Sequence, residues 1–299
     1  MPCITPALIR TWLPQRPAQA HKGNFGRVLV VAGSRRMCGA GFLCAKSALT
    51  AGAGVVYWAL PASMQPAFAA SLPEVITVPL PETDTGEIAA AAWELFPEIC
   101  QHYHPSLIVV GPGMGASPLL PALLTNINLP LIVDADGLNA LARQPRWQLG
   151  WPQERPSIFT PHPGEIARLL RGEVAQTDEA RRAQAEQVAA FTGGVCLCKG
   201  APTWVAAQAE VYQNTTGGPA LAKAGSGDVL TGVIAGLWAQ LGTAAAFSVR
   251  TALQAAVCGV YLHGLAGDLA AQNSSIYSVL ATDTLAHLPR AFQACREGL

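Results

Sequence analysis

Charge is scarce in this sequence, and neither sign is in excess. Asp, Glu, Lys and Arg together make up only 13% of the 299 residues, and 19 basic residues balance 19 acidic ones. Such a neutral chain gives no electrostatic reason to expect a nucleic acid or an anionic membrane surface as a partner. Hydrophobic residues make up 51%. The chain can therefore bury a sizeable core, which argues against intrinsic disorder.

Paired cysteines of the kind that bind metals are also missing. None of the eight cysteines forms a C-x-x-C pair, so the spacing of a zinc site is absent. Cys196 and Cys198 are separated by one residue, which on a strand would place both side chains on one face. Scattered thiols in a chain of this size are typical of reduced, mostly buried residues. We therefore expect a cytoplasmic protein, in which zinc ligation by these cysteines is possible but lacks the spacing.

No segment resembles a signal peptide or a membrane span. Residues 1–20 contain no continuous apolar core. The longest apolar run follows Asp228, but a polar Gly-Ser-Gly-Asp turn opens it and Gln240 interrupts it, which favours a buried core helix. Domain linkers and long repeats are absent as well. We expect residues 1–299 to form a single domain, with residues 1–20 as a short lead-in.

The chain does contain a repeated alternation of short apolar runs and Ala-rich segments. Helices are predicted within residues 39–54 and over most of the chain from Asp228 onward. Strands are predicted within residues 27–33, 55–60, 106–115, 130–141, 157–170, 194–207 and 210–214. This alternation indicates an α/β fold with a parallel sheet wrapped by helices. Ligands of such sheets bind outside the carboxyl ends of the strands, so the turns after the strands are the places to search.

Two of these turns permit more than one interpretation. GPGMG (residues 111–115) fits a plain turn best, although its backbone could also approach a ligand closely. It matches neither G-x-G-x-x-G nor G-x-x-x-x-G-K-[ST], so neither nucleotide-binding pattern is supported. DADGLN (residues 134–139) places two carboxylates at a strand end. If the strand continues, they share a face and could hold a metal or steady a catalytic residue; they could equally cap the next helix.

Two further turns carry single polar side chains. In TPHPGE, two prolines hold His162 in an extended, rigid turn, and Glu165 follows at a helix start, where a carboxylate suits the dipole. His162 is suited to hydrogen-bonding a ligand, although a histidine packed in a loop would have the same sequence. In KGAPT, Lys199 follows an apolar strand and needs an anion or water, while Gly200 would let a phosphate approach the backbone.

The segment AGSGD, residues 224–228, is the strongest local signal. Small residues expose backbone N–H groups, and the following helix contributes its positive end, so the two together form an anion-binding site. We expect the helix dipole to hold Asp228 ionised, ready to accept a proton from a hydroxyl beside a phosphate. Helix capping is the alternative for any single aspartate, but capping alone would not require Gly225 and Gly227 on either side of Ser226.

Taken in order, these turns resemble the ADP-dependent NAD(P)H-hydrate dehydratases of the ribokinase-like superfamily. The resemblance covers nearly the whole chain and is carried by HKGNFGRVLVVAGS, GAGFLCAKSALTAGAGVV, LPEVIT, VVGPGMG, VDADGLNAL, TPHPGEIARLL, KGAPTWVA and GGPALAKAGSGDVLTGVIAGLWAQ. The G-x-G-D turn is shared with many kinases, whereas HKGNFG and TPHPGE distinguish this family. The resemblance implies a three-layer sandwich, with a mostly parallel sheet between two layers of helices.

The resemblance also implies a lyase reaction. Hydrated NADH or NADPH carries a hydroxyl on C6 of its nicotinamide ring. A phosphoryl group from ADP, or from ATP in some relatives, would convert that hydroxyl into a leaving group. Elimination would then return NAD(P)H with AMP and phosphate. Asp228 would deprotonate the hydroxyl, and the amides of residues 225–227 would stabilise the transferred group. Mg²⁺ would bridge the phosphates largely through water.

Matching the family's motifs to this sequence implies which residues contact each ligand. The nucleotide contacts fall on Lys199, Gly200, Ala201, Pro202, Thr203, Gly225, Ser226 and Gly227. The hydrate contacts fall on Ala40, Gly113, His162 and Asp228. The resemblance implies a homo-oligomer, often a tetramer. Because only about twenty residues precede the first motif, we expect no fused epimerase domain. Epimerisation of the other hydrate isomer would then come from a separate epimerase or be absent.

One position departs from the family pattern. Gly218 stands where the family often has Asn, so one phosphate contact would be lost if that Asn makes one. Two other functions remain open. A ribokinase-like kinase for a small alcohol, such as a vitamin precursor, would use the same Asp228 and release a stable phosphorylated product. A nucleotide-binding protein without turnover would be indifferent to Asp228→Asn.

Overall fold

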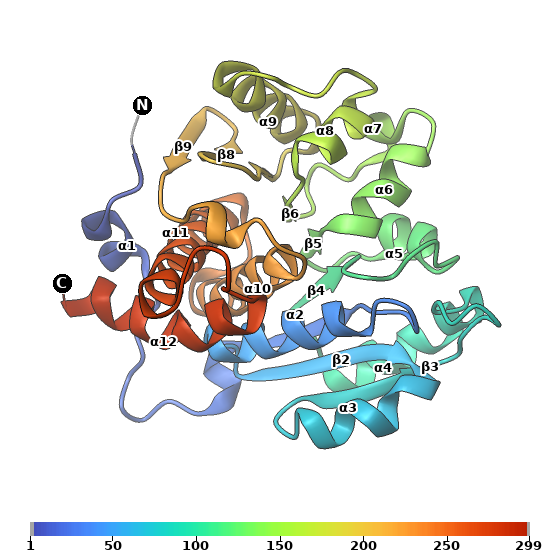
Figure 1. The fold of residues 1–299 in the computed structure, drawn as a ribbon. Coiled ribbons are helices and arrows are strands. Elements are labelled where there is room, and N and C mark those ends of the chain that lie inside the picture. The colour runs from blue at the N-terminus through green and yellow to red at the C-terminus, as the bar shows by residue number, and fades with distance from the viewer. Residues whose placement is uncertain (1–2, 298–299) are drawn as a thin grey trace.

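A single nine-stranded sheet runs through the computed structural model, which describes residues 3–297. The strands lie in the order β3-β2-β1-β4-β5-β6-β7-β8-β9 (Figure 1). All pairs from β3 to β7 are parallel, and β8 and β9 add an antiparallel edge. The strands are β1 Arg27–Val31, β2 Val55–Pro61, β3 Ile76–Leu80, β4 Leu107–Val110, β5 Leu131–Val133, β6 Ser157–Phe159, β7 Val195–Cys198, β8 Thr203–Ala207 and β9 Glu210–Asn214.

The central strands are apolar along their whole length because both faces of the sheet are covered. Successive side chains point to opposite faces. In β1, Val28 and Val30 pack into one core, while Leu29 and Val31 pack into the other. The same alternation holds along the sheet, which therefore separates two hydrophobic layers.

Each layer has its own helices. The first core is closed by α1 Pro6–Trp12, α2 Cys38–Thr50, α3 Gln65–Ser71, α10 Ser226–Ala245, α11 Val249–Asn273 and α12 Ala281–Glu297. The second is closed by α4 Phe96–Tyr103, α5 Leu120–Asn126, α6 Ala135–Arg143, α7 Trp147–Gly150, α8 Pro163–Leu170 and α9 Asp178–Thr192. Short 3₁₀ helices are η1 Lys22–Phe25, η2 Ala62–Met64, η3 Ala90–Leu95 and η4 Pro219–Leu221. This is the three-layer α/β arrangement predicted from the sequence.

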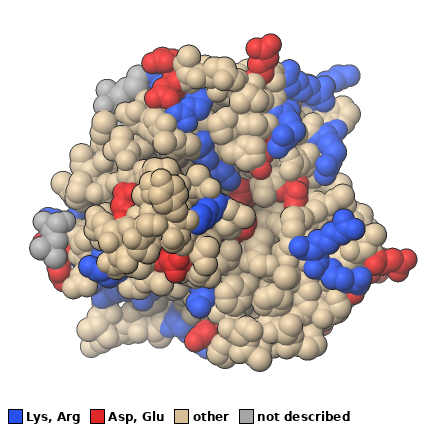
Figure 2. Space-filling view, in the orientation of Figure 1, with Lys and Arg blue, Asp and Glu red and all other residues tan. Residues whose placement is uncertain are grey.

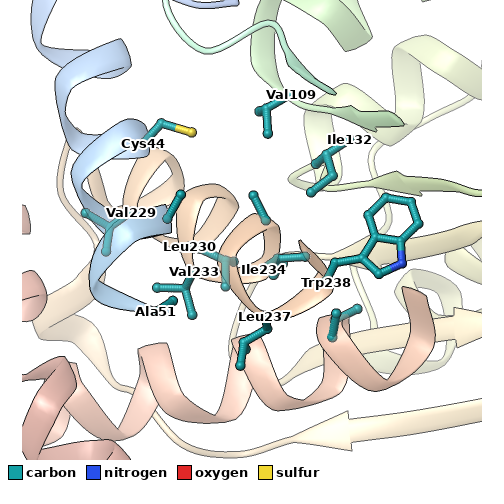
Figure 3. Packing of buried hydrophobic residues seen from close by; sticks show 14 of the residues in the cluster. Cys44, Ala51, Val109, Ile132, Val229, Leu230, Val233, Ile234, Leu237 and Trp238 are labelled. Atoms are coloured by element: carbon teal, nitrogen blue, oxygen red, sulfur yellow. The ribbon is translucent and has the colours of Figure 1, made fainter. Parts of the chain in front are cut away.

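Helix α10 lies in the middle of the first layer. Figure 3 shows it between α2, α11 and the strands, with Val229, Val233 and Leu237 packed among neighbouring side chains. Its apolar run is buried, as the sequence predicted, and Gln240 is buried with its amide donating to the carbonyls of Ala51 and Gly236. Two glycines permit the close approach to α2: a Cβ on Gly232 would lie 2.2 Å from the Cys44 carbonyl oxygen. Burial in the core thus fixes where the N-terminus of α10 lies.

The cysteines behave as their scattered spacing indicated. All eight are free thiols; five are buried, including Cys196 and Cys198, which face the same core. Among the helices of residues 3–297, none combines the length and hydropathy that a membrane crossing requires.

Candidate functional site

A cavity of about 660 Å³ opens at the carboxyl edge of the sheet, beside the N-terminus of α10. Three parallel strands end there: β5 is followed by Asp134, β6 by the loop to His162, and β7 by Lys199, and all three residues line the cavity. Figure 2 shows both signs of charge near the centre of this face, where β4 to β6 end beside α10 in Figure 1. The cavity is therefore where a doubly wound sheet places its ligand.

The turn that opens α10, residues 225–228, directs backbone N–H groups to a common side and is called the cradle below. Gly225 has φ +87°, and α10 begins directly after it at Ser226. Within residues 3–297, the amide groups of Gly225, Gly227 and Asp228 donate to no protein acceptor, whereas that of Ser226 donates to the Lys223 carbonyl at 3.3 Å. Unpaired N–H groups at a helix start attract a negative group. The left-handed φ also supplies a reason for glycine at position 225.

Asp228 lies in the first turn of α10 and faces the cavity. Burial, reinforced by the negative charge of Asp134, raises its pKa to about 7, although Lys199 opposes the shift. The expectation that the helix end would hold this carboxyl fully ionised is therefore wrong: desolvation exceeds the effect of the dipole. A carboxyl that titrates near neutrality is suited to accept a proton from a hydroxyl.

Asp134 is the functional residue that sequence reasoning left unresolved. Its carboxylate is almost fully buried and accepts two hydrogen bonds, from Lys199 Nζ at 2.9 Å and from Thr231 Oγ1 at 2.7 Å. Thr231 lies one turn after Asp228 on α10, so Asp134 connects the ends of β5 and β7 to the helix that carries Asp228. The sequence indicated that Lys199 requires an anion or water, and the carboxylate of Asp134 is that anion.

The two carboxylates of DADGLN do not share a face. The strand ends at Val133, and Ala135 adopts φ +46°, which turns the chain into α6. Asp136 consequently points to another loop, where it accepts a hydrogen bond from the Gly115 amide at 2.7 Å. Asp134 occupies the N-cap position of α6 but makes no capping hydrogen bond. Of the alternatives left open, steadying a catalytic residue is the one that the contacts of Asp134 with Lys199 and Thr231 favour.

Lys199 extends from the end of β7 toward the cradle. Its side chain is 20% exposed, and a Cβ added to Gly227 would lie 3.4 Å from its Nζ. Burial alone would lower the pKa of Lys199, but the carboxylates of Asp134, Glu165 and Asp228 raise it above the ordinary value. The ammonium group therefore stays charged beside the unpaired amides.

The rest of KGAPT lines the same cavity. Gly200 has φ +155°, and its amide donates to Thr203 Oγ1 at 3.3 Å, which fixes the turn. Gly200, Ala201 and Thr203 line the large cavity, while Pro202 lines an adjoining one of about 170 Å³ that it shares with Ala201.

His162 both caps a helix and faces the cavity. It is the N-cap of α8, where its Nδ1 accepts from the amides of Gly164 at 3.0 Å and Glu165 at 3.3 Å. Its Nε2 lies 3.5 Å from Glu165 Oε1, and half of the side chain is exposed. Burial lowers the pKa of His162, with the cations of Lys199 and Arg168 acting in the same direction. The imidazole is thus rigidly placed with its outer edge toward the cavity.

Two predicted hydrate contacts lie outside this cavity lining. Gly113 has φ +62°, and a Cβ added there would lie 2.7 Å from the Cβ of Ala40, so these two residues adjoin each other. They belong to the α2 side of the site, where a Cβ on Gly225 would lie 2.7 Å from Leu43 Cδ1. The predicted residues therefore form two groups on opposite sides of the cradle: those that line the cavity, and the pair Ala40 and Gly113 beside α2.

One polar residue of the cavity wall carries no signal in the sequence. His263 belongs to the apolar helix α11, is 6% exposed, and lies with its Nε2 3.3 Å from Ser226 Oγ. A histidine in an apolar helix is indistinguishable by sequence from any packed side chain. No group of three or more His, Cys, Asp or Glu side chains in residues 3–297 is arranged to hold a metal ion.

Comparison with known proteins agrees with this geometry. A family model for NAD(P)H-hydrate dehydratases matches residues 28–290. A bifunctional NAD(P)H-hydrate repair enzyme of Moorella thermoacetica is 41% identical over 98% of this chain and 54% of its own length. The chain thus spans about half the length of the curated relatives that it matches.

Solved structures give the same result. An ADP/ATP-dependent NAD(P)H-hydrate dehydratase from Bacillus subtilis, co-crystallized with ATP and Mg²⁺, is 29% identical, has a TM-score of 0.81 and covers 98% of both chains. A ribokinase-like superfamily protein from Enterococcus faecalis is 26% identical, has a TM-score of 0.79 and covers 97% of this chain and 95% of its own. The fold predicted from the sequence, a ribokinase-like sandwich, is confirmed.

Proposed function

This chain belongs to the NAD(P)H-hydrate dehydratase family, a family of lyases, and we propose that it uses ADP to return hydrated NADH or NADPH to the reduced dinucleotide. The observation that carries the proposal is the position of Asp228. A carboxyl with a pKa of about 7 lies in the first turn of α10, beside amides that have no protein acceptor. A proton acceptor next to an anion cradle is what phosphorylation of a hydroxyl requires.

The reaction divides into two steps. Asp228 takes the proton of the C6 hydroxyl, the hydroxyl oxygen bonds to the β-phosphorus of ADP, and the bond from that phosphorus to the bridging oxygen breaks to release AMP. The C6–O bond then breaks with departure of phosphate, which takes a proton from the neighbouring ring carbon as the double bond forms. The products are NAD(P)H, AMP and phosphate.

The cradle would stabilise the transferred phosphoryl group. The amides of Gly225, Gly227 and Asp228 are fixed by the backbone, so they need no reorganisation when charge moves onto that group. Lys199, held by Asp134 at 2.9 Å, adds a positive charge at the same place. These fixed donors and charges would act most strongly in a partly buried cavity, where water screens them little.

The remaining predicted contacts divide between the two substrates. Gly200, Ala201, Pro202 and Thr203 form the turn that would hold the AMP part. His162, whose Nδ1 accepts from two backbone amides, would donate to the hydrate from Nε2, and Ala40 and Gly113 would contact it from the α2 side.

The cavity fits a magnesium ion bound mainly to phosphate. Asp134, Glu165 and Asp228 supply hard oxygen donors at its wall, but Asp134 is already occupied by Lys199 and Thr231. Mg²⁺ retains most of its water and binds through one or two carboxylates plus phosphates. When bound, it would neutralise phosphate charge. The protein residues would position the two substrates and move the proton.

Several broader assignments rest on the resemblance. We propose that residues 1–299 form one dehydratase domain, since one sheet joins every strand of residues 3–297. We further propose a cytoplasmic homotetramer that works with an epimerase for the other hydrate isomer.

A coupled assay tests the function. The purified protein is mixed with hydrated NADH or NADPH, Mg²⁺ and ADP, while absorbance of the reduced nicotinamide, AMP and phosphate are followed together. Recovery of NAD(P)H in equal amount to AMP supports the dehydratase. A stable phosphorylated product from a small alcohol, with no recovery of NAD(P)H from ADP or ATP, would indicate a kinase instead. Adenine-nucleotide binding without any turnover would indicate a binding protein.

A further inference from the structure

The side chain of His263 lies behind the cradle and has no role in the mechanism above. His263 of α11 and Ser226 of α10 are distant in the sequence, yet His263 Nε2 lies 3.3 Å from Ser226 Oγ, and both side chains are more than nine-tenths buried. Both residues also line the cavity. Buried polar groups are normally hydrogen-bonded, and here the two groups satisfy each other.

The charge state of His263 limits what this pair can do. Burial lowers the pKa of His263 to about 4; a hydrogen bond with the Ser226 backbone opposes this shift, and the positive charge of Lys199 adds to it. The imidazole is therefore neutral at physiological pH, with one nitrogen that donates and one that accepts. Either Ser226 donates to Nε2 or Nε2–H donates to Ser226 Oγ.

The surroundings of Ser226 favour one of these two arrangements. The space in front of it is bordered by unpaired amides and by Lys199, whose Nζ would lie 3.4 Å from a Cβ at Gly227. A phosphoryl group offers only acceptors, so a hydroxyl that faces it must donate. Ser226 has a single hydroxyl proton, so it can donate to the phosphoryl group only if it does not donate to His263 and instead accepts from it. A neutral histidine with its proton on Nε2 provides that donor.

We propose that His263 is a positioning residue that donates Nε2–H to Ser226 Oγ and thereby directs the Ser226 hydroxyl proton at the terminal phosphoryl group of the nucleotide. The inference rests on the proposed function only in placing that group in the cradle. Ser226 then acts as a side-chain donor beside the amides of Gly225, Gly227 and Asp228. His263 itself does not touch the nucleotide.

Calorimetric titration of the full chain with ADP and with AMP tests this placement. Only ADP carries the phosphoryl group that Ser226 would contact. Losing one hydrogen bond of ordinary strength lowers affinity by about three- to tenfold. We expect Ser226→Ala and His263→Leu each to weaken ADP binding by that factor and to change AMP binding less than twofold. His263→Gln, whose amide can donate from a similar position, should restore most of the ADP affinity.

The double variant Ser226→Ala/His263→Leu separates a positioning role from a merely structural one. If His263 acts through Ser226, the double variant binds ADP as weakly as Ser226→Ala alone. Additive losses, or equal losses for ADP and AMP, would overturn the proposal. Tighter ADP binding by His263→Leu would show that Ser226 had donated to the histidine, which also overturns it. Thermal unfolding of each variant checks that the fold is intact.

These titrations need no turnover, so they report separately from the coupled assay. A wild-type protein that binds ADP more tightly than AMP, but recovers no NAD(P)H, would overturn the function and leave the His263 test valid. An active wild type with additive losses would overturn the role of His263 alone.

Discussion

The ammonium group of Lys199 and the buried carboxylate of Asp134 form an ion pair at 2.9 Å, and both line the cavity that contains Asp228. The two charges act on Asp228 in opposite directions: Asp134 raises its pKa, whereas Lys199 lowers it. Burial is the largest cause of the raised pKa of Asp228, and the pair adjusts that pKa further. It also fixes the end of β7 against α10.

Removing one member of this pair at a time should move the pH profile in opposite directions. Asp228 acts as a base when ionised, so kcat should fall as the pH drops through about 7. Asp134→Asn removes a like charge, so the fall in kcat should move to lower pH by about one unit. Lys199→Met removes an opposite charge and should move it to higher pH. The kcat of each variant is measured from pH 5.5 to 9 at saturating ADP. Shifts in the same direction, or none, would contradict this electrostatic role.

Asp228→Asn should separate binding from chemistry. The amide keeps the shape of the side chain but cannot take the proton, so we expect kcat to fall by about 10²- to 10⁴-fold. ADP affinity should change less than threefold, because the cradle amides remain. Asp283→Asn is the matched control: Asp283 is in the first turn of α12 and accepts from the Leu280 amide. It should leave turnover unchanged. Equal turnover of Asp228→Asn and wild type would remove Asp228 from the mechanism.

The same variant should be more stable than the wild type in alkaline buffer. The folded-state pKa of Asp228 is raised to about 7 from its ordinary value of 3.8, so the folded protein disfavours the ionised carboxylate. That penalty is fully present above the raised pKa and disappears as the pH falls toward the unfolded value. Asp228→Asn should therefore unfold a few degrees higher at pH 8. The difference should shrink at pH 5, as differential scanning calorimetry can measure.

Local sequence patterns predict the elements and the position of the cradle, but not its electrostatics. The apolar run after Asp228 and the glycines around Ser226 place a helix start correctly. The dipole of that helix is visible in the sequence, whereas the burial that outweighs it depends on packing against α2 and the sheet. The raised pKa of Asp228 could therefore not be read from the chain alone.

Contacts between distant segments are the other part that the sequence does not reveal. Asp134 and Lys199 follow different strands, and only the parallel order of β5, β6 and β7 brings their side chains together. The left-handed turn at Ala135, at a non-glycine residue, separates Asp134 from Asp136 and has no simple local signature. His263 meets Ser226 because α11 packs on α10, a contact that no periodicity encodes.

His162 has two roles that different substitutions should separate. His162→Ala removes both the cap of α8 and the outer nitrogen, whereas His162→Asn keeps a good N-cap residue. If Nε2 contacts the hydrate, both variants should weaken hydrate binding by about tenfold and ADP binding much less. Only His162→Ala should also lower thermal stability. Binding is measured by titration with each ligand separately. Equal weakening for ADP and the hydrate would exclude the assigned contact.

The departure at Gly218 offers a gain-of-affinity test. Gly218 has an extended backbone with φ −142°, and an added Cβ would have only Asp268 Oδ1 nearby, at 4.0 Å. Gly218→Asn should therefore fold normally, and its amide should strengthen ADP binding about two- to fivefold if it reaches a phosphate. Gly225→Ala is the contrasting change, because φ +87° and a contact of 2.7 Å with Leu43 oppose any side chain there. It should weaken ADP binding. Unchanged ADP binding by Gly218→Asn would show that the phosphates lie beyond the reach of this side chain.

Close packing of α10 on α2 should matter for activity as well as for stability. A Cβ at Gly232 would lie 2.2 Å from the Cys44 carbonyl oxygen, which belongs to the backbone and cannot rotate away. Gly232→Ala must therefore push the helices apart, at a cost of about 1–3 kcal/mol in unfolding free energy. Gly39→Ala is the control, since a Cβ at this α2 position has no neighbour within 4 Å and alanine favours a helix by up to about 1 kcal/mol.

The two alanine variants should also differ in catalysis. Thr231, which donates to Asp134, directly precedes Gly232 on α10, and Asp228 lies one turn before it. A displaced helix would move these two side chains relative to Asp134 and Lys199, which belong to the sheet edge. Misplacement of a reacting group by about 1 Å can cost 10²-fold in rate, so kcat of Gly232→Ala should fall more than its ADP affinity. Urea unfolding and steady-state kinetics measure both effects. A destabilised Gly232→Ala with unchanged kcat would mean that the start of α10 is held by the sheet rather than by α2.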